Sequence, residues 1–188
     1  MERIYTIGHS NIQVSQFVDL LQTSKIEVVV DVRSRPFSEY AAQFNRGRIE
    51  HSLSTNNIKY VYMGDLVGGK PQDPIFYDRH GYVRYDTIAE SASFKVGISR
   101  LMKGIVLYRV ALMCSEEDPT NCHRRLLIGK VLKEREIDVL HIRKGGIIQT
   151  EEYLRTTEAQ FQPDLFGHQA KPLWRSAKPV LVKRRSAL

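Results

Sequence analysis

The stretch from residue 105 to 132 constrains the fold most, because an apolar run there ends at a cysteine and a polar loop leads into a helix pattern. Residues 106–113 are short and rich in β-branched side chains, which predicts a buried central strand with Cys114 at its carboxyl end. Asp118 followed by Pro119 is typical of an N-cap and a first helical residue. This order places both cysteines of the chain beside a helix N-terminus, where anions and thiolates are stabilised.

Strand and helix patterns alternate along the rest of the chain. Strands are expected at residues 3–7, 28–32, 59–63 and 137–142, and helices at 45–53, from a cap at Asp86 to Lys103, and at 150–157. The alternation predicts one three-layer α/β domain over residues 1–160, with a mostly parallel five-stranded sheet of the Rossmann-like or flavodoxin-like kind. Residues 64–81 hold four glycines and two prolines, so we expect a long loop that closes over a ligand site.

Length and composition indicate one well-buried domain, since the chain has 188 residues and a hydrophobic content of 42%. No apolar run approaches the roughly 18 residues of a membrane span, and the first residues follow a strand pattern instead of that of a signal peptide. We therefore expect a cytoplasmic protein with no membrane partner and with reduced cysteines.

The net charge of +7 is concentrated in a C-terminal basic extension, residues 161–188. From His168 onward the chain has six basic residues and no acidic one: Lys171, Arg175, Lys178, Lys183, Arg184 and Arg185. A near-neutral domain with a basic extension favours a nucleic acid or nucleotide partner, or a merely solubilising role.

The same extension contains a short segment, Gln162, Asp164, Leu165 and Phe166, that resembles the bacterial sliding-clamp-binding motif. Proline stands at its second position, where leucine is usual. The alternative is that Leu165, Phe166 and Trp174 anchor the extension on its own domain, with the last ten or so residues mobile.

Polar side chains gather where the predicted strands end. Parallel sheets bind ligands outside the carboxyl ends of their strands, at the point where the strand order reverses. The residues at those ends are His9 and Ser10 after the first strand, Asp31 and Arg33 at the second, and Cys114 and Glu116 at the fourth. We expect the ligand site at this edge of the sheet.

Three segments, TIGHS (residues 6–10), DVRSRPFS (31–38) and MCSEEDPTNCHRRLL (113–127), resemble in order and spacing the bacterial and archaeal family of unknown function DUF488. The resemblance spans roughly residues 1–155. It implies the α/β fold and a site shared by the three segments, but it implies no reaction.

The first hypothesis for this site is a cysteine-dependent hydrolase or transferase that acts on an anionic, phosphate-bearing or nucleotide substrate. In it Cys114 is the nucleophile, His9 or His123 assists it, and the substrate contacts Ser10, Asp31, Arg33, Arg35, Glu116 and Arg124. Two alternatives stay open: Cys114 is a packed apolar side chain, and the arginines pair internally with carboxylates. The acidic residues 116–118 beside the thiol would also repel an anion.

The second hypothesis is a metal site from Cys114, Cys122 and His123, completed by His9 or a carboxylate. Seven residues separate the cysteines, unlike a compact zinc knuckle, so the spacing predicts no metal, no cofactor and less than one equivalent of zinc. The competing class is a non-enzymatic nucleic-acid or DNA-repair-associated protein that binds through its basic extension.

Overall fold

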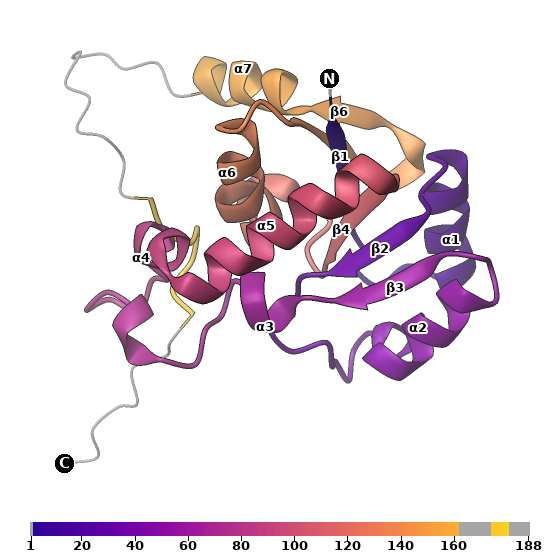
Figure 1. Cartoon of the computed structure of the whole chain (residues 1–188), viewed down its shortest axis with the longest axis horizontal. Coiled ribbons are helices and arrows are strands. Elements are labelled where there is room, and N and C mark those ends of the chain that lie inside the picture. Colours follow the sequence, from indigo (N-terminus) through magenta and orange to yellow (C-terminus); the bar gives the residue numbers. More distant parts are fainter. Residues whose placement is uncertain (1, 162–173, 181–188) are drawn as a thin grey trace.

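The computed structural model describes residues 2–161 and 174–180 (Figure 1). Its centre is a six-stranded sheet of order β3-β2-β4-β1-β5-β6. The strands are β1 (Arg3–Gly8), β2 (Val28–Asp31), β3 (Lys59–Tyr62), β4 (Val110–Cys114), β5 (Asp138–Ile142) and β6 (Ile148–Thr150). The expected α/β class is confirmed. The expected five-stranded, mostly parallel sheet is wrong, because β6 pairs antiparallel with β5 and makes a six-stranded mixed sheet.

The strand order also differs from both doubly wound orders, 3-2-1-4-5-6 of Rossmann folds and 2-1-3-4-5 of flavodoxin-like folds. In this chain β4 lies between β2 and β1 and pairs parallel with both. The carboxyl ends of these three strands are therefore neighbours, and each of the three sequence segments ends or begins at one of them.

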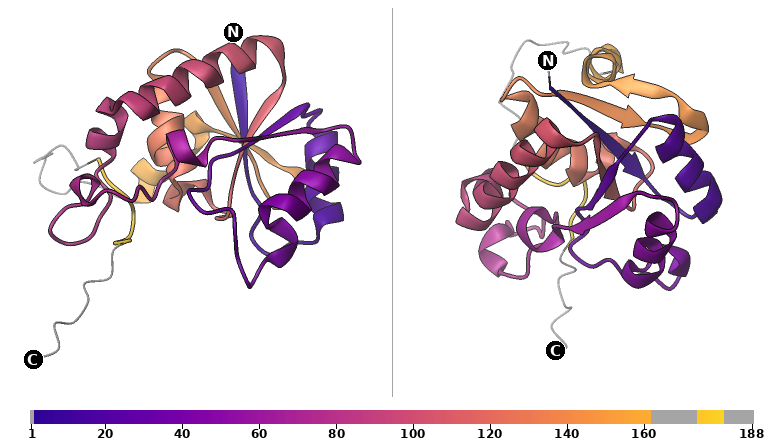
Figure 2. Two further views of the ribbon diagram at one scale, coloured as in Figure 1. Left: turned by 60° about the horizontal axis from the view of Figure 1, so that its bottom comes forward. Right: turned by 45° about the vertical axis from the view of Figure 1, so that its right-hand side comes forward.

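Helices cover both faces of the sheet (Figure 2). On one face α1 (Val14–Thr23) and α2 (Arg46–Ser54) contribute buried side chains to one core cluster. The other face is covered by α3 (Gly64–Val67), α4 (Tyr85–Glu90), α5 (Ala92–Leu107) and α6 (Lys130–Lys133). The last helix, α7 (Glu151–Phe161), contacts β5 and β6. Short turns are η1 (Ala42–Phe44), η2 (Pro74–Phe76), η3 (Pro119–Asn121) and η5 (Lys144–Gly146).

Burial explains why the central strands are continuous apolar runs. Every residue of β2 and β4 is buried, as expected for parallel strands covered on both faces. Val28 and Val30 pack into the cluster under α5, whereas Val29 packs into the cluster under α1 and α2.

Two predicted boundaries around α5 are wrong. β4 begins at Val110 and not at residue 106, because α5 continues through Leu107, with Val106 and Leu107 on its exposed side. A run of apolar β-branched residues fits a helix end as well as a strand. Asp86 does not cap the long helix; Ser91 does, and its Oγ accepts a hydrogen bond from the Phe94 amide.

The Asp118–Pro119 prediction is confirmed only as a local turn. Asp118 Oδ1 accepts from the Thr120 amide at 2.9 Å, and Pro119 begins η3, a single turn instead of a long helix. A π-helical stretch, η4 (Arg124–Gly129), then leads into α6. Because Asp118 occupies the Thr120 amide, that amide is not available to an anion. The predicted 64–81 loop contains α3 and η2.

The described part of the C-terminal extension, residues 174–180, packs on the domain. The Trp174 indole donates to the Leu126 carbonyl at 2.6 Å, and the Ser176 amide donates to the Val83 carbonyl at 2.9 Å. The predicted clamp-binding segment, including Leu165 and Phe166, lies outside the described residues.

Among the described residues, no helix combines the length and the apolar character required to cross a bilayer.

Candidate functional site

The site forms where the loop after β4 folds against the end of β1. The His9 amide donates to the Cys114 carbonyl at 3.0 Å, and the Ser10 amide donates to the Ser115 carbonyl at 2.8 Å. A Cβ on Gly8 would lie 1.6 Å from the Glu116 carbonyl oxygen, so only glycine allows this approach. The close contact fixes residues 114–117 beside the first two sequence segments.

Two buried thiols form the centre of the site. Cys114 ends β4, and Cys122 follows η3. Glu116 Oε2 lies 3.0 Å from the Cys114 sulfur and 3.3 Å from the Cys122 sulfur. His123 Nδ1 lies 3.7 Å and 3.9 Å from the same two sulfurs. The ligand atoms of Cys114, Cys122 and His123 all lie within 4.8 Å of one another.

The His123 ring is oriented from two sides. Its Nε2 donates to the Val32 carbonyl at 3.0 Å, so in the neutral ring Nδ1 carries the lone pair, next to the two sulfurs. A Cβ on Gly69 would lie 2.4 Å from the ring's Cγ. The segment after α3 therefore contacts the site through the backbone of Gly69.

The two thiols differ in acidity. Burial opposes ionisation of Cys122, but hydrogen bonds with Cys114 and His123 and the charge of Arg124 lower its pKa to about 5. The hydrogen bond with Cys122, together with burial, raises the pKa of Cys114 well above its usual value. Burial also opposes ionisation of Glu116, yet hydrogen bonds from the thiols hold its pKa below the usual value. Of the two thiols, Cys122 is therefore the more readily ionised, while the Cys114 thiol keeps its proton and donates it in a hydrogen bond to Glu116.

A second buried cluster surrounds Asp31 and Arg33. Arg33 donates to Asp31 Oδ1 from Nε at 2.9 Å and to Oδ2 from Nη2 at 2.6 Å. Arg33 Nη1 donates to His9 Nε2 at 3.0 Å, while His9 Nδ1 donates to the Ser10 carbonyl at 2.7 Å. The Tyr60 hydroxyl donates to Asp31 Oδ2 at 2.7 Å. Both ring nitrogens of His9 are thus occupied by hydrogen bonds. Of the two histidines predicted to assist the thiol, His123 is the one that contacts it.

Arg124 is fully buried and holds the loop backbone. It donates to Thr6 Oγ1 at 3.2 Å, to the Glu117 carbonyl at 2.7 Å and to the Glu116 carbonyl. Internal pairing with a carboxylate is therefore found for Arg33, whereas Arg124 donates to backbone carbonyls and a hydroxyl inside the protein. Of the predicted anion-binding residues, Ser10, Arg35 and Glu116 are exposed over the whole residue, although the Glu116 carboxylate itself lies against the two buried thiols.

Sequence reasoning missed the contacts of Thr6, Tyr60 and Gly69, and it considered Cys122 only as a metal ligand. Thr6 and Tyr60 lie in strand patterns where a hydroxyl carries no special signal. The glycine pair at 68–69 was visible, but only the folded chain shows that it contacts His123.

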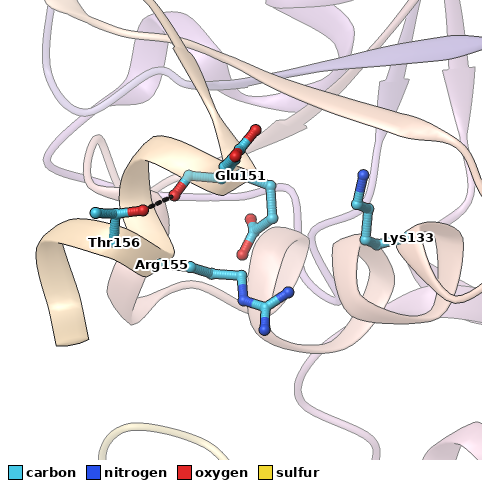
Figure 3. A pocket seen from close by; sticks show the side chains of 5 residues that line it. Lys133, Glu151, Arg155 and Thr156 are labelled. Atoms are coloured by element: carbon cyan, nitrogen blue, oxygen red, sulfur yellow. Dashed lines mark hydrogen bonds between the residues drawn. The ribbon is translucent and has the colours of Figure 1, made fainter.

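A surface cavity of about 530 Å³ lies between α6 and α7 and shares no residue with the thiol cluster (Figure 3). It is lined by Lys133, Glu151, Glu152, Arg155 and Thr156. The Glu151 carboxylate already accepts hydrogen bonds from Arg125 at 2.9 Å and lies 3.2 Å from His141 Nε2. Its most buried acidic group is therefore engaged inside the protein.

Comparison with known proteins gives one match. A family model described as a domain of unknown function, DUF488, matches residues 13–131, which include β2, β3, β4 and both cysteines. No curated protein and no solved structure matches the chain.

Proposed function

This chain belongs to the DUF488 family, a membership that assigns no activity. We propose a function from the site itself: the protein binds a divalent transition metal, zinc foremost. Its ligands are Cys114, Cys122 and His123, with Glu116 as the fourth. The observation that carries the proposal is the separation of the four donor atoms. Zinc bonds of about 2.0–2.3 Å place tetrahedral ligand atoms about 3.3–3.8 Å apart. Four of the six separations, those from Glu116 Oε2 and from His123 Nδ1 to each sulfur, run from 3.0 to 3.9 Å, and the donor atoms of Cys114, Cys122 and His123 all lie within 4.8 Å of one another.

The chemistry of the donors supports the same proposal. Thiolate, imidazole and carboxylate are the groups that zinc prefers in proteins. The Val32 carbonyl fixes the ring through Nε2, as a backbone carbonyl commonly does for a metal-binding histidine. The hydrogen bond with Cys122, burial and the negative charges of Cys122 and Glu116 keep the proton on the Cys114 thiol. A bound cation would release that proton.

Exposure distinguishes the four ligands. Cys114 and Cys122 are 4% and 1% exposed, whereas Glu116 is an exposed residue of the loop. Glu116 is thus the ligand that water or a substrate can replace, and three protein ligands with one exchangeable position are typical of catalytic zinc sites. The wide cysteine spacing that argued against a metal is compensated by the η3 turn, which returns Cys122 to the end of β4.

The second candidate is the cysteine-dependent enzyme, and the low pKa of Cys122 favours it. In this version Cys122, and not Cys114, is the nucleophile: both thiols are buried, but the pKa of Cys122 is lowered whereas the hydrogen bond with Cys122 raises that of Cys114. An anionic substrate gains little support, since Arg33 and Arg124 donate to groups inside the protein.

Metal analysis separates the two candidates. Protein purified without chelator should contain about one equivalent of zinc, and the apoprotein loaded with Co²⁺ should show a thiolate-to-cobalt charge-transfer band and the intense visible bands of a tetrahedral ion. Cys122→Ser and His123→Ala should lose both signals. His51→Ala, which changes an exposed histidine on α2, is the matched control.

A zinc content below about a tenth of an equivalent, with no thiolate band after cobalt loading, would overturn the metal proposal. Rapid alkylation of Cys122 near pH 6 in that same preparation would support the thiolate enzyme instead. Circular dichroism of each variant establishes that a lost signal does not come from unfolding.

A further inference from the structure

A groove on the side of the molecule that holds α5 and β3 is unrelated to the thiol cluster. It has a volume of about 280 Å³ and an almost wholly apolar lining that includes Val28, Val30, Val61 and Leu101. Figure 1 shows α5 lying across the sheet, with β3 at its outer edge. We propose that this groove binds an extended peptide segment of a partner protein, in which apolar side chains alternate with acidic ones.

The edge of β3 supplies the backbone partners for such a segment. The amides of Lys59 and Met63 donate to the Glu27 and Asp31 carbonyls of the β2 side at 2.9 and 3.0 Å. In a parallel pair alternate residues bond to the same neighbour, so the backbone groups of Tyr60 and Tyr62 point away from β2. They bond to no other described backbone group. An added strand would satisfy them, as in β-augmentation.

The spacing of side chains on β3 gives the apolar part of the recognition. Lys59, Val61 and Met63 alternate along the strand and line the groove. A peptide strand paired beside β3 would place every second side chain over the same apolar surface. A volume of about 280 Å³ accommodates a small number of such side chains and is too small for a folded helix.

Gly104 keeps the groove open. It lies in the last turns of α5, and a Cβ built there would meet no heavy atom within 4 Å. Glycine is the weakest helix former after proline, so local helix stability does not explain its presence. Because Gly104 has no side chain, the groove stays unfilled next to Leu107. The Leu107 side chain also lines the groove and is 71% exposed.

The rim of the groove determines the charge of the partner. Lys59, Arg100 and Lys103 line it, no acidic residue does, and none of the three forms an ion pair with a described residue. Charge complementarity therefore favours carboxylates. The one aromatic ring at the rim, Tyr108, has the Lys59 ammonium over one face, 4.5 Å from its centroid.

A peptide selection tests the proposal with the full-length protein. A random-peptide phage library is selected on the immobilised protein, and enriched peptides are synthesised with a fluorescent label for anisotropy titrations. The enriched family should alternate apolar and acidic residues. Gly104→Phe, which fills the groove, should weaken binding about tenfold or more, and Lys103→Glu should weaken it as well.

Gly47→Phe is the matched control, because Gly47 lies on α2, over the opposite face of the sheet, and also has open space around it. Peptides that bind Gly104→Phe and the wild type equally, or the absence of an enriched family, would overturn the proposal. Two other outcomes would also overturn it. One is an oligonucleotide that binds the wild type but not Gly104→Phe. The other is a dimer, seen by sedimentation, that Gly104→Phe dissociates. Metal content measured on the same variants keeps this result separate from the zinc proposal.

Discussion

His9 shows how burial determines the chemistry of a single residue. Its ring stacks on Phe44 at 4.2 Å and accepts a hydrogen bond from Arg33. Burial, and then the positive charge of Arg33, lower its pKa from 6.5 to about 4. The imidazole is therefore neutral near pH 7 and keeps Arg33 in place instead of activating a thiol.

The low pKa of His9 makes the protein less stable in acid. The unfolded chain takes up a proton at His9 as the pH falls through 6.5, whereas the folded chain does so only near pH 4, so stability decreases with decreasing pH between these values. From pH 7 to pH 5 the free energy of unfolding should decrease by about 2 kcal/mol through this residue. Urea unfolding of His9→Gln should show a correspondingly smaller decrease.

His51→Gln serves as the control, since it replaces an exposed histidine on α2, outside the buried cluster of His9 and Arg33. Identical pH dependence in the wild type and His9→Gln would contradict the assigned neutral state of His9.

At the scale of elements, short apolar runs bounded by polar residues made four of the five expected strands predictable to within a residue or two at each end. β6 was missed because its three residues are at most half-buried and pair with β5 alone. The π-helical turns of η4 were missed because they depend on tertiary contacts. Arg124 bonds to the loop after β4, and the adjacent Arg125 donates to Glu151 and Glu158 on α7.

The site was predictable only in outline, for the same reason. Strand ends indicated where Cys114, Asp31 and Arg33 would lie, because the carboxyl edge of a parallel sheet follows from the strands alone. The convergence of Cys122 and Glu116 on Cys114 requires the η3 turn, whose path no periodicity encodes. The internal pairing of Arg33 required knowledge of its burial.

The segment after α3 gives a prediction about metal affinity. Gly69→Ala places a methyl group about where the His123 ring now lies, since a Cβ at that position is 2.4 Å from Cγ. The ring would shift away from the sulfurs without loss of a ligand. Zinc affinity, measured by competition with a chromophoric chelator, should decrease roughly 10–100-fold. Gly47→Ala, which has open space, should leave it unchanged, and equal affinities for the two variants would argue against a ligand role for His123.

At the scale of the whole molecule, residues 174–180 join parts of the chain that are distant in sequence. The Tyr85 amide donates to the Trp174 carbonyl at 3.0 Å, and the indole donates to Leu126 of η4. Lys130 of α6 lies over the indole ring, 4.5 Å from its centroid. Arg175, one of the six basic residues, pairs with Asp78 at 3.1 Å, so part of the positive charge of the extension is neutralised on the domain.

This arrangement predicts that Trp174 stabilises the whole domain. Trp174→Ala removes the hydrogen bond to Leu126 and the packing against α4 and α6, which together contribute about 2 kcal/mol for a half-buried indole. For a protein of this size the melting temperature should decrease by roughly 4–8 °C. Tyr153→Ala, an exposed aromatic residue on α7, should change it by less than about 1 °C. Because the hydrogen bonds of Trp174 go to Leu126 and Tyr85 and not to a member of the thiol cluster, zinc content should be the same in both variants. A melting temperature unaffected by Trp174→Ala would mean that the extension does not hold α4 and η4 together in solution.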